Sequence, residues 1–135
     1  MNRKTELLLL SLHFFLEWKG DKKVDDSTLK EYHKFLNTVC NRLCRTEDEI
    51  KAYIGKAYDK LSIITEHEDV TANALILSTG FLSLALEEDY LKGSQAMTAK
   101  RIGNDIYTKV EDNLNDKDMI RISNKLIAEY QDKAD

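Results

Sequence analysis

Proline is absent from this chain, and only 5 of its 135 residues are glycine. Strand-rich folds need frequent turns, and turns draw heavily on these two residue types. The scarcity of both therefore favours long helices joined by short polar links. Apolar residues make up 42% of the sequence and charged residues 33%, which is the balance of a folded chain rather than a disordered one. We predict one all-α domain spanning residues 1–135.

Apolar residues also recur at a spacing of about 3.6 along most of the sequence, which predicts about six helices. Thr46 and Glu49 match the capping box that begins many helices. Gly20 and Gly93 stand where glycine commonly ends a helix. The predicted helices cover approximately residues 4–19, 27–44, 46–64, 70–91, 94–114 and 116–130.

The stretch 74–86 has no polar face of its own when drawn as a helix, and it contains no charged residue. A helix of this kind must be surrounded by protein. We therefore expect a compact bundle with one central hydrophobic helix at about 70–91. The N-terminal helix is also apolar almost all round, and two such helices are harder to bury inside one monomer. Either both lie in the core, or the first also contributes to an oligomer or partner contact.

The N-terminal helix carries the apolar residues that we predict at such a contact. Leu12 and Trp18 share one side of this helix, and Leu9 and Leu16 lie further round. Because one bundle can bury only part of the circumference, one of these sides should be exposed, and contiguous exposed apolar surface usually marks an interface. All four residues are therefore predicted to bind another protein or a second copy of this chain in a homodimer.

A second candidate surface is Glu87-Glu88-Asp89, at the C-terminal end of the predicted central helix. The helix dipole favours cations at this end, so three acids break a local rule. Such violations are more often functional than other positions are. The functional interpretation is a docking site for a basic surface on another protein, and the alternative is a solvated acidic end.

Cys40 and Cys44, together with His33, fall on one edge of the predicted second helix. Three such side chains could bind zinc. However, structural zinc sites normally draw on two chain segments, and a cysteine beside an apolar stripe packs as a small hydrophobe. Two cysteines on one helix with this spacing are also poorly placed for a disulfide. We therefore expect two free, packed thiols.

Residues Glu66, His67, Glu68 and Asp69 form a second group of metal-ligand types. Acids just before a helix also complement the positive end of its dipole, which is the simpler interpretation. The sequence contains no metalloprotease, nucleophile-elbow, phosphate-loop or calcium-loop motif. We predict no catalytic residue, no bound metal and no cofactor.

The net charge of −4 is too small to identify a partner, but its distribution is uneven. Residues 1–60 hold 12 basic and 10 acidic residues, whereas residues 61–135 hold 8 and 14. Binding to nucleic acid irrespective of its sequence needs a cationic stripe, which is not visible here. A DNA-binding helix pair near Arg42, Arg45 and Lys51 stays an alternative, although the acidity and the glycine-free turn weaken it.

The N-terminus imitates a secretory signal, since Arg3 and Lys4 precede the apolar residues 7–16. Glu6 lies just before the apolar run, however, and no small-x-small cleavage site follows it. The uncharged residues 70–86 fall short of the ~20 residues that span a bilayer. We predict a cytoplasmic protein without a membrane segment, and two cysteines without a disulfide framework also suit a reducing compartment.

These features favour a non-catalytic protein that acts by occupying a surface on another protein. It would be an inhibitor, an immunity protein or a small regulatory subunit of the phage or mobile-element type. Its contact would be a leucine and aromatic cluster ringed by charge. Two alternatives are a metal-binding or enzymatic helical bundle and the helical DNA-binding regulator.

Overall fold

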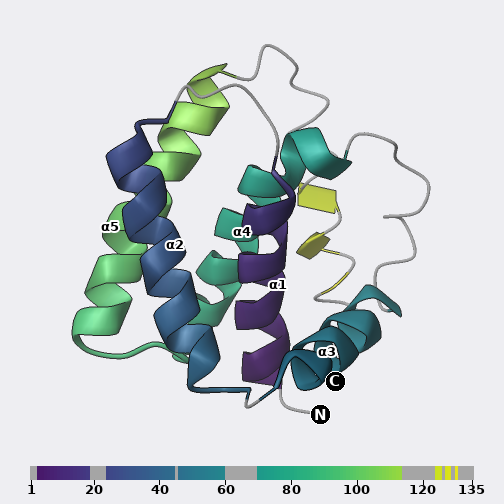
Figure 1. Cartoon of the computed structure of the whole chain (residues 1–135). Coiled ribbons are helices and arrows are strands. Elements are labelled where there is room, and N and C mark those ends of the chain that lie inside the picture. The colour runs from purple at the N-terminus through teal and green to yellow at the C-terminus, as the bar shows by residue number, and fades with distance from the viewer. Residues whose placement is uncertain are drawn as a thin grey trace.

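The computed structural model describes residues 3–18, 24–44, 46–59 and 70–113 and, near the C-terminus, residues 124, 125, 127, 128 and 130. The described residues form α-helices, and no strand occurs among them. The helices, arranged as Figure 1 shows, are α1 (Arg3–Glu17), α2 (Asp26–Asn41), α3 (Glu47–Asp59), α4 (Val70–Glu87) and α5 (Ser94–Asn113). The predicted all-α class is confirmed for this part of the chain.

The described part of the chain contains five helices, rather than the predicted number of about six. The predicted sixth helix, 116–130, lies mostly outside the described residues. Those of its positions that are described, residues 124, 125, 127, 128 and 130, have helical backbone. The predicted third helix extended to residue 64, whereas α3 is described only as far as Asp59.

Local capping explains where the helices begin. The backbone N–H of Glu49 donates to Thr46 Oγ1 at 3.2 Å, which confirms the predicted cap of α3. α2 begins directly after Asp25, one residue earlier than expected.

Gly93 does not end α4 as predicted. Its carbonyl accepts a hydrogen bond from the N–H of Met97 at 3.2 Å, so Gly93 instead precedes the first turn of α5.

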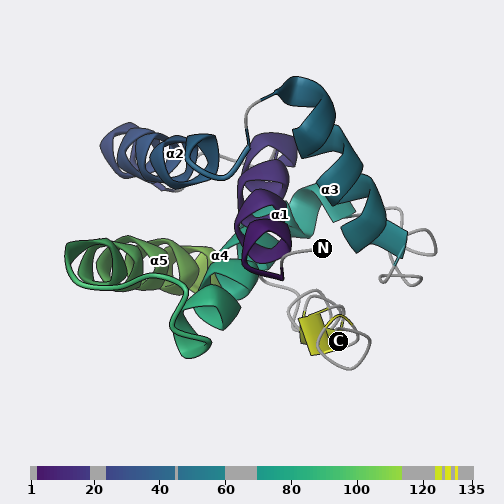
Figure 2. The same ribbon diagram turned by 90° about the horizontal axis from the view of Figure 1, so that it is seen from below.

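The expectation of one central helix is incomplete, because α1 and α4 form a central pair (Figure 2). α1 packs against α2, α3 and α4, and α4 packs against α1 and α5. α2 and α5 lie side by side. Every residue in 5–12 and in 74–79 is buried. The two helices cover each other, so both of the sequence's all-round apolar helices fit within one chain.

α4 is the most apolar of the described helices, and its only charged residue is Glu87. Within the part of the chain that the structure describes, no helix has the combined length and apolar character needed to cross a membrane. The apolar surface of α4 is covered by α1 and α5 instead.

Three buried hydroxyl groups join α1, α2 and α4. Ser11 Oγ donates to the carbonyl of Ser78 at 2.8 Å, and Ser78 Oγ donates to the carbonyl of Ser11 at 2.6 Å. Each serine hydroxyl has one hydrogen, which this exchange uses. The hydroxyl of Tyr32, 2.8 Å from Ser78 Oγ, must therefore be the donor in that contact. All three side chains are fully buried, so these bonds offset the cost of removing the hydroxyls from water.

Two helical glycines test how the helices pack. A methyl group added at Gly55 would meet nothing within 4 Å, whereas one at Gly80 would collide with the side chain of Ile127. We predict that Gly55→Ala raises the free energy of unfolding by about 0.5–1 kcal/mol, because alanine is the better helix former. Gly80→Ala should lower it by roughly 1–3 kcal/mol, because Ile127 must move. Urea denaturation measures both, and equal effects would contradict the position of Ile127 against α4.

Candidate functional site

The structure corrects one part of the predicted surface on α1. Leu9 is fully buried, so the prediction that α1 is exposed on this side is wrong at Leu9. The physical reason is that α2, α3 and α4 all pack against α1 and cover its middle from several sides. Leu12, which was also predicted to bind a partner, is 8% exposed and belongs to the core.

The C-terminal end of α1 extends beyond this cover. Leu16 is 57% exposed, and Met97 on α5 is the other exposed large apolar side chain among the described residues. Phe15 and Trp18 are partly buried and pack against the core. The predicted exposure of α1 is therefore found at Leu16 rather than at Leu9.

Phe15, which precedes Leu16 in the sequence, lines a shallow groove of about 300 Å³ together with Leu29 and His33 of α2. The ring of Phe15 lies 5.3 Å from the rings of both Tyr32 and His33, with the first of these contacts edge-to-face. Packing between rings restricts the positions that an aromatic side chain can take. One wall of the groove is therefore apolar, aromatic and held in place before any partner binds.

Charged side chains surround this apolar surface. Asp26 and Lys30 line the groove and are exposed, and Glu17 is exposed directly after Leu16. His13 Nε2 lies 4.0 Å from Glu17 Oε1. Burial nevertheless lowers the pKa of His13, against the opposite effect of Glu17, so the imidazole is neutral at pH 7 and does not compensate this carboxylate. An apolar contact ringed by charge is the usual composition of a protein interface.

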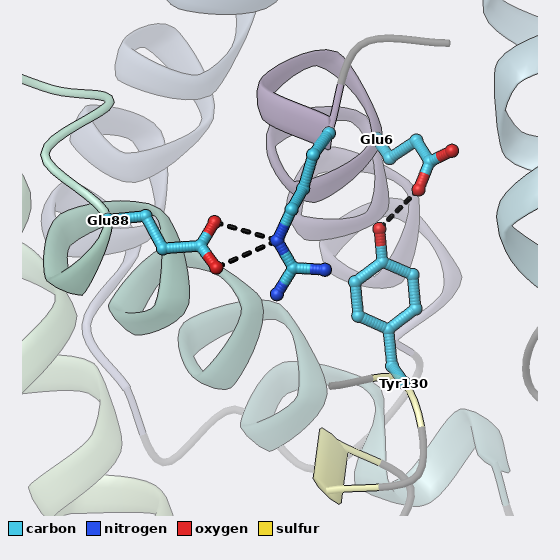
Figure 3. Close-up of polar contacts among 4 residues, drawn as sticks. Glu6, Glu88 and Tyr130 are labelled. Carbon is cyan, nitrogen blue, oxygen red and sulfur yellow. Dashed lines mark hydrogen bonds and ion pairs between the residues drawn. The ribbon is translucent and has the colours of Figure 1, made fainter. Parts of the chain in front are cut away.

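The three acids at the end of α4 have different surroundings. Arg3 Nε lies 2.7 and 2.8 Å from the two carboxylate oxygens of Glu88, so Glu88 is paired within the chain (Figure 3). Asp89 shapes the backbone where α4 ends, and Glu87 lines a groove between α4 and α5. Glu87 and Asp89 are exposed and Glu88 is partly buried, and the docking of these acids to a basic surface stays a prediction.

Asp89 ends α4 in the left-handed backbone region, with φ of 58°. The N–H of Asp89 donates to the carbonyl of Leu86, and the N–H of Tyr90 donates to the carbonyl of Ala85 at 2.9 Å. These two bonds satisfy carbonyls that the helix leaves without partners, in the pattern of a Schellman cap. Glycine is the usual residue at this position because it has no Cβ.

We predict that Asp89→Gly raises the free energy of unfolding by about 0.5–1 kcal/mol, because it relieves the left-handed conformation and removes an acid from a helix C-terminus. Asp89→Asn is the matched control, since it removes the charge alone. Thermal and urea unfolding measure both variants. A loss of stability in Asp89→Gly would show that the Asp89 carboxylate makes a stabilising contact.

A buried polar cluster, which sequence reasoning missed, ties α1 to the C-terminal residues. Glu6 is 1% exposed and Tyr130 is fully buried. The hydroxyl of Tyr130 donates to Glu6 Oε2 (Figure 3), and burial together with this carboxylate raises the pKa of Tyr130. The guanidinium of Arg3 lies 5.4 Å from the centre of the Tyr130 ring. The sequence signal for this cluster is Glu6, an acid in an otherwise apolar helix. A buried carboxylate needs a hydrogen-bonding or charged partner.

Cys40 and Cys44 are free and buried, as predicted. Cys40 Sγ donates to the carbonyl of Leu8 at 3.3 Å, and burial raises the pKa of the Cys40 thiol to about 12. The ring of His33 packs against that of Phe15 of α1, with the two planes tilted by 33°. Among the described residues, no group of three His, Cys, Asp or Glu side chains is placed to hold a metal. The predicted alternative at residues 66–69 lies outside the described residues.

The residues of the DNA-binding alternative are not assembled into a basic surface in the part of the chain that is described. Arg42 is exposed, Lys51 Nζ lies 3.5 Å from Glu47 Oε1, and Arg45 falls outside the described residues. Acids occupy the first turn of α3, close in sequence to these basic residues. Among the described residues, the acids close to Arg42 and Lys51 weaken the DNA-binding alternative, which stays a prediction.

We predict that the Cys40 thiol is nearly inert in the native protein. A pKa of about 12 leaves only about one thiol in 10⁴ ionised at pH 8, and the thiolate is the form that reacts. Iodoacetamide should modify Cys40 at least about 100-fold more slowly in the native protein than in urea. Mass spectrometry of the Cys40 peptide gives both rates. Rapid native labelling would place this thiol at the surface.

Comparisons with known proteins add no constraint on function. No family model matches the chain, and no curated protein and no solved structure is significantly similar to it. The candidate site is therefore interpreted from its own geometry and charges.

Proposed function

We propose that this chain is a non-catalytic protein that binds another protein through the C-terminal end of α1. The contact surface consists of Leu16 and the groove lined by Phe15, Leu29 and His33. The supporting observation is the 57% exposure of Leu16, which follows the groove residue Phe15 in the sequence, on a helix whose middle is entirely buried. Acting by surface occupation, the chain would serve as an inhibitor, an immunity protein or a small regulatory subunit.

The groove matters more to this proposal than Leu16 alone. Fully burying a leucine contributes roughly 1.5–3 kcal/mol, so covering the exposed part of Leu16 contributes on the order of 1 kcal/mol. Single exposed apolar residues are common and need no partner. A partner can also place an apolar side chain against the ring of Phe15. Because this ring is already held in place, the second contact costs no further conformational entropy of Phe15.

The rim charges specify the kind of partner. Two exposed carboxylates, Glu17 and Asp26, and one ammonium, Lys30, flank the apolar surface. A partner surface with apolar side chains at its centre and a predominantly basic edge matches this arrangement, because rim charges mainly set specificity and association rate. Trp18, also predicted to bind a partner, is partly buried and packs against the core.

A homodimer is a second use of the same surface, and it stays a prediction. The rim charges do not separate it from binding to another protein, because in a two-fold contact Lys30 of one copy can face Asp26 of the other. Light scattering over a range of protein concentrations separates them, because only the homodimer predicts a concentration-dependent mass.

The test compares the two exposed large apolar side chains, Leu16 on α1 and Met97 on α5. Tagged wild-type protein, Leu16→Glu and Met97→Glu would each be expressed in the native host, and captured proteins quantified by mass spectrometry. We predict that a specific partner captured by the wild type falls at least about tenfold with Leu16→Glu, because a charge is buried in the contact. Met97→Glu should capture it normally.

Folding is the control for both substitutions. Leu16 and Met97 are exposed, so each variant should keep the helical circular dichroism spectrum and the melting temperature of the wild type. A partner that is lost with Met97→Glu and kept with Leu16→Glu would move the binding surface to α5. Equal capture by all three proteins would contradict a contact at either residue.

A further inference from the structure

A polar groove follows the contact between α4 and α5, away from the surface at Leu16. It consists of two adjoining hollows of about 300 and 430 Å³. Both hollows are lined by Ser83 and Glu87 of α4 and by Gly103 and Asn104 of α5. Because glycine has no side chain, Gly103 leaves the groove open to the backbone of α5. Each hollow by itself is near the lower end of the size range of small-molecule sites.

Two side chains of opposite charge line the first hollow. Glu87 comes from α4 and Lys100 from α5, and both are exposed. Neither forms an ion pair with the other or with another described residue; the ion pairs of the described chain involve different residues. One carboxylate and one ammonium therefore line the same small space without neutralising each other.

Hydrogen-bonding groups accompany these charges. The amide of Asn104 and the hydroxyl of Ser83 both line the groove, and each can donate as well as accept. The hydroxyl of Thr79 already donates to the carbonyl of Ile76 at 2.9 Å, so it offers only lone pairs to the groove. This donor set suits a ligand whose polar end carries both a cation and an anion.

The second hollow provides space of a different character. Beyond the residues that it shares with the first hollow, it is lined by Gly80, Leu84, Tyr107, Asn124 and Ile127. Four of these five residues are apolar or aromatic, and Asn124 adds one amide. A ligand with a zwitterionic end and an apolar side chain would match both hollows at once.

We propose that this groove binds a free α-amino acid with an apolar side chain. Glu87 binds the α-ammonium group, Lys100 binds the α-carboxylate, and the ligand side chain extends toward Leu84 and Tyr107. Charge-assisted hydrogen bonds of this kind are stronger than neutral ones. The proposal is independent of the protein-binding surface at Leu16, because the two surfaces share no residue.

The probes are L-leucine and L-phenylalanine, titrated singly into ¹⁵N-labelled full-length protein and followed by amide chemical shifts. We expect saturable shifts at α4 and α5 below about 10 mM ligand, which is the affinity range of a small, partly open site. N-acetyl-L-leucine lacks the ammonium and L-leucinamide lacks the carboxylate. If Glu87 binds the ammonium and Lys100 binds the carboxylate, each analogue should bind at least about tenfold more weakly than L-leucine.

Substitutions identify the residues responsible. Glu87→Gln and Lys100→Gln should each weaken L-leucine binding at least about tenfold. Lys92→Gln, which removes an exposed charge outside the groove, is the matched control and should bind as the wild type does. These exposed substitutions should leave the fold intact, as the amide spectra would show. Absence of saturation, or equal affinity in all variants, would overturn the proposal.

Discussion

The contact between α1 and α4 is the constraint on which the rest of the structure depends. Ser11 and Ser78 are small enough to let the helices approach, and each hydroxyl donates to the other residue's backbone carbonyl. A shift of either helix would leave two buried hydroxyls without partners, at a cost of about 1–3 kcal/mol each. The register of the pair is therefore fixed, and α2 and α3 pack on α1 while α5 packs on α4.

This central pair also determines where binding surfaces can form. The middle of α1 is covered from several sides, so only its C-terminal end presents apolar surface, at Leu16. On the other side of the pair, α4 contains no charged residue before Glu87. Glu87 lines the groove that α4 shares with α5. The first proposed surface thus lies at the end of α1, and the second follows the contact between α4 and α5. One is apolar with charges at its rim, and the other is polar with an apolar extension.

The sequence predicted what depends on local pattern. Helical periodicity, the cap at Thr46 and the burial of Cys40 and Cys44 all follow from residues close together in the chain. The burial of Leu9 could not be predicted, because it depends on where three other helices pack. The same is true of Glu88, whose partner Arg3 is 85 residues away. The three acids are unusual at the C-terminal end of a helix, which is visible in the sequence. Only the fold shows that Glu88 pairs with Arg3, that Asp89 ends α4 and that Glu87 lines a groove.

The bond between Tyr130 and Glu6 has a consequence for the synthesis of this protein. The two residues are separated by 124 positions. At about 5–20 residues per second, Glu6 therefore leaves the ribosome several seconds or more before Tyr130 is added. During that interval the hydroxyl of Tyr130 is not there to offset the burial of the Glu6 carboxylate. The final packing around Glu6 at the start of α1 therefore forms only after residue 130 has been made.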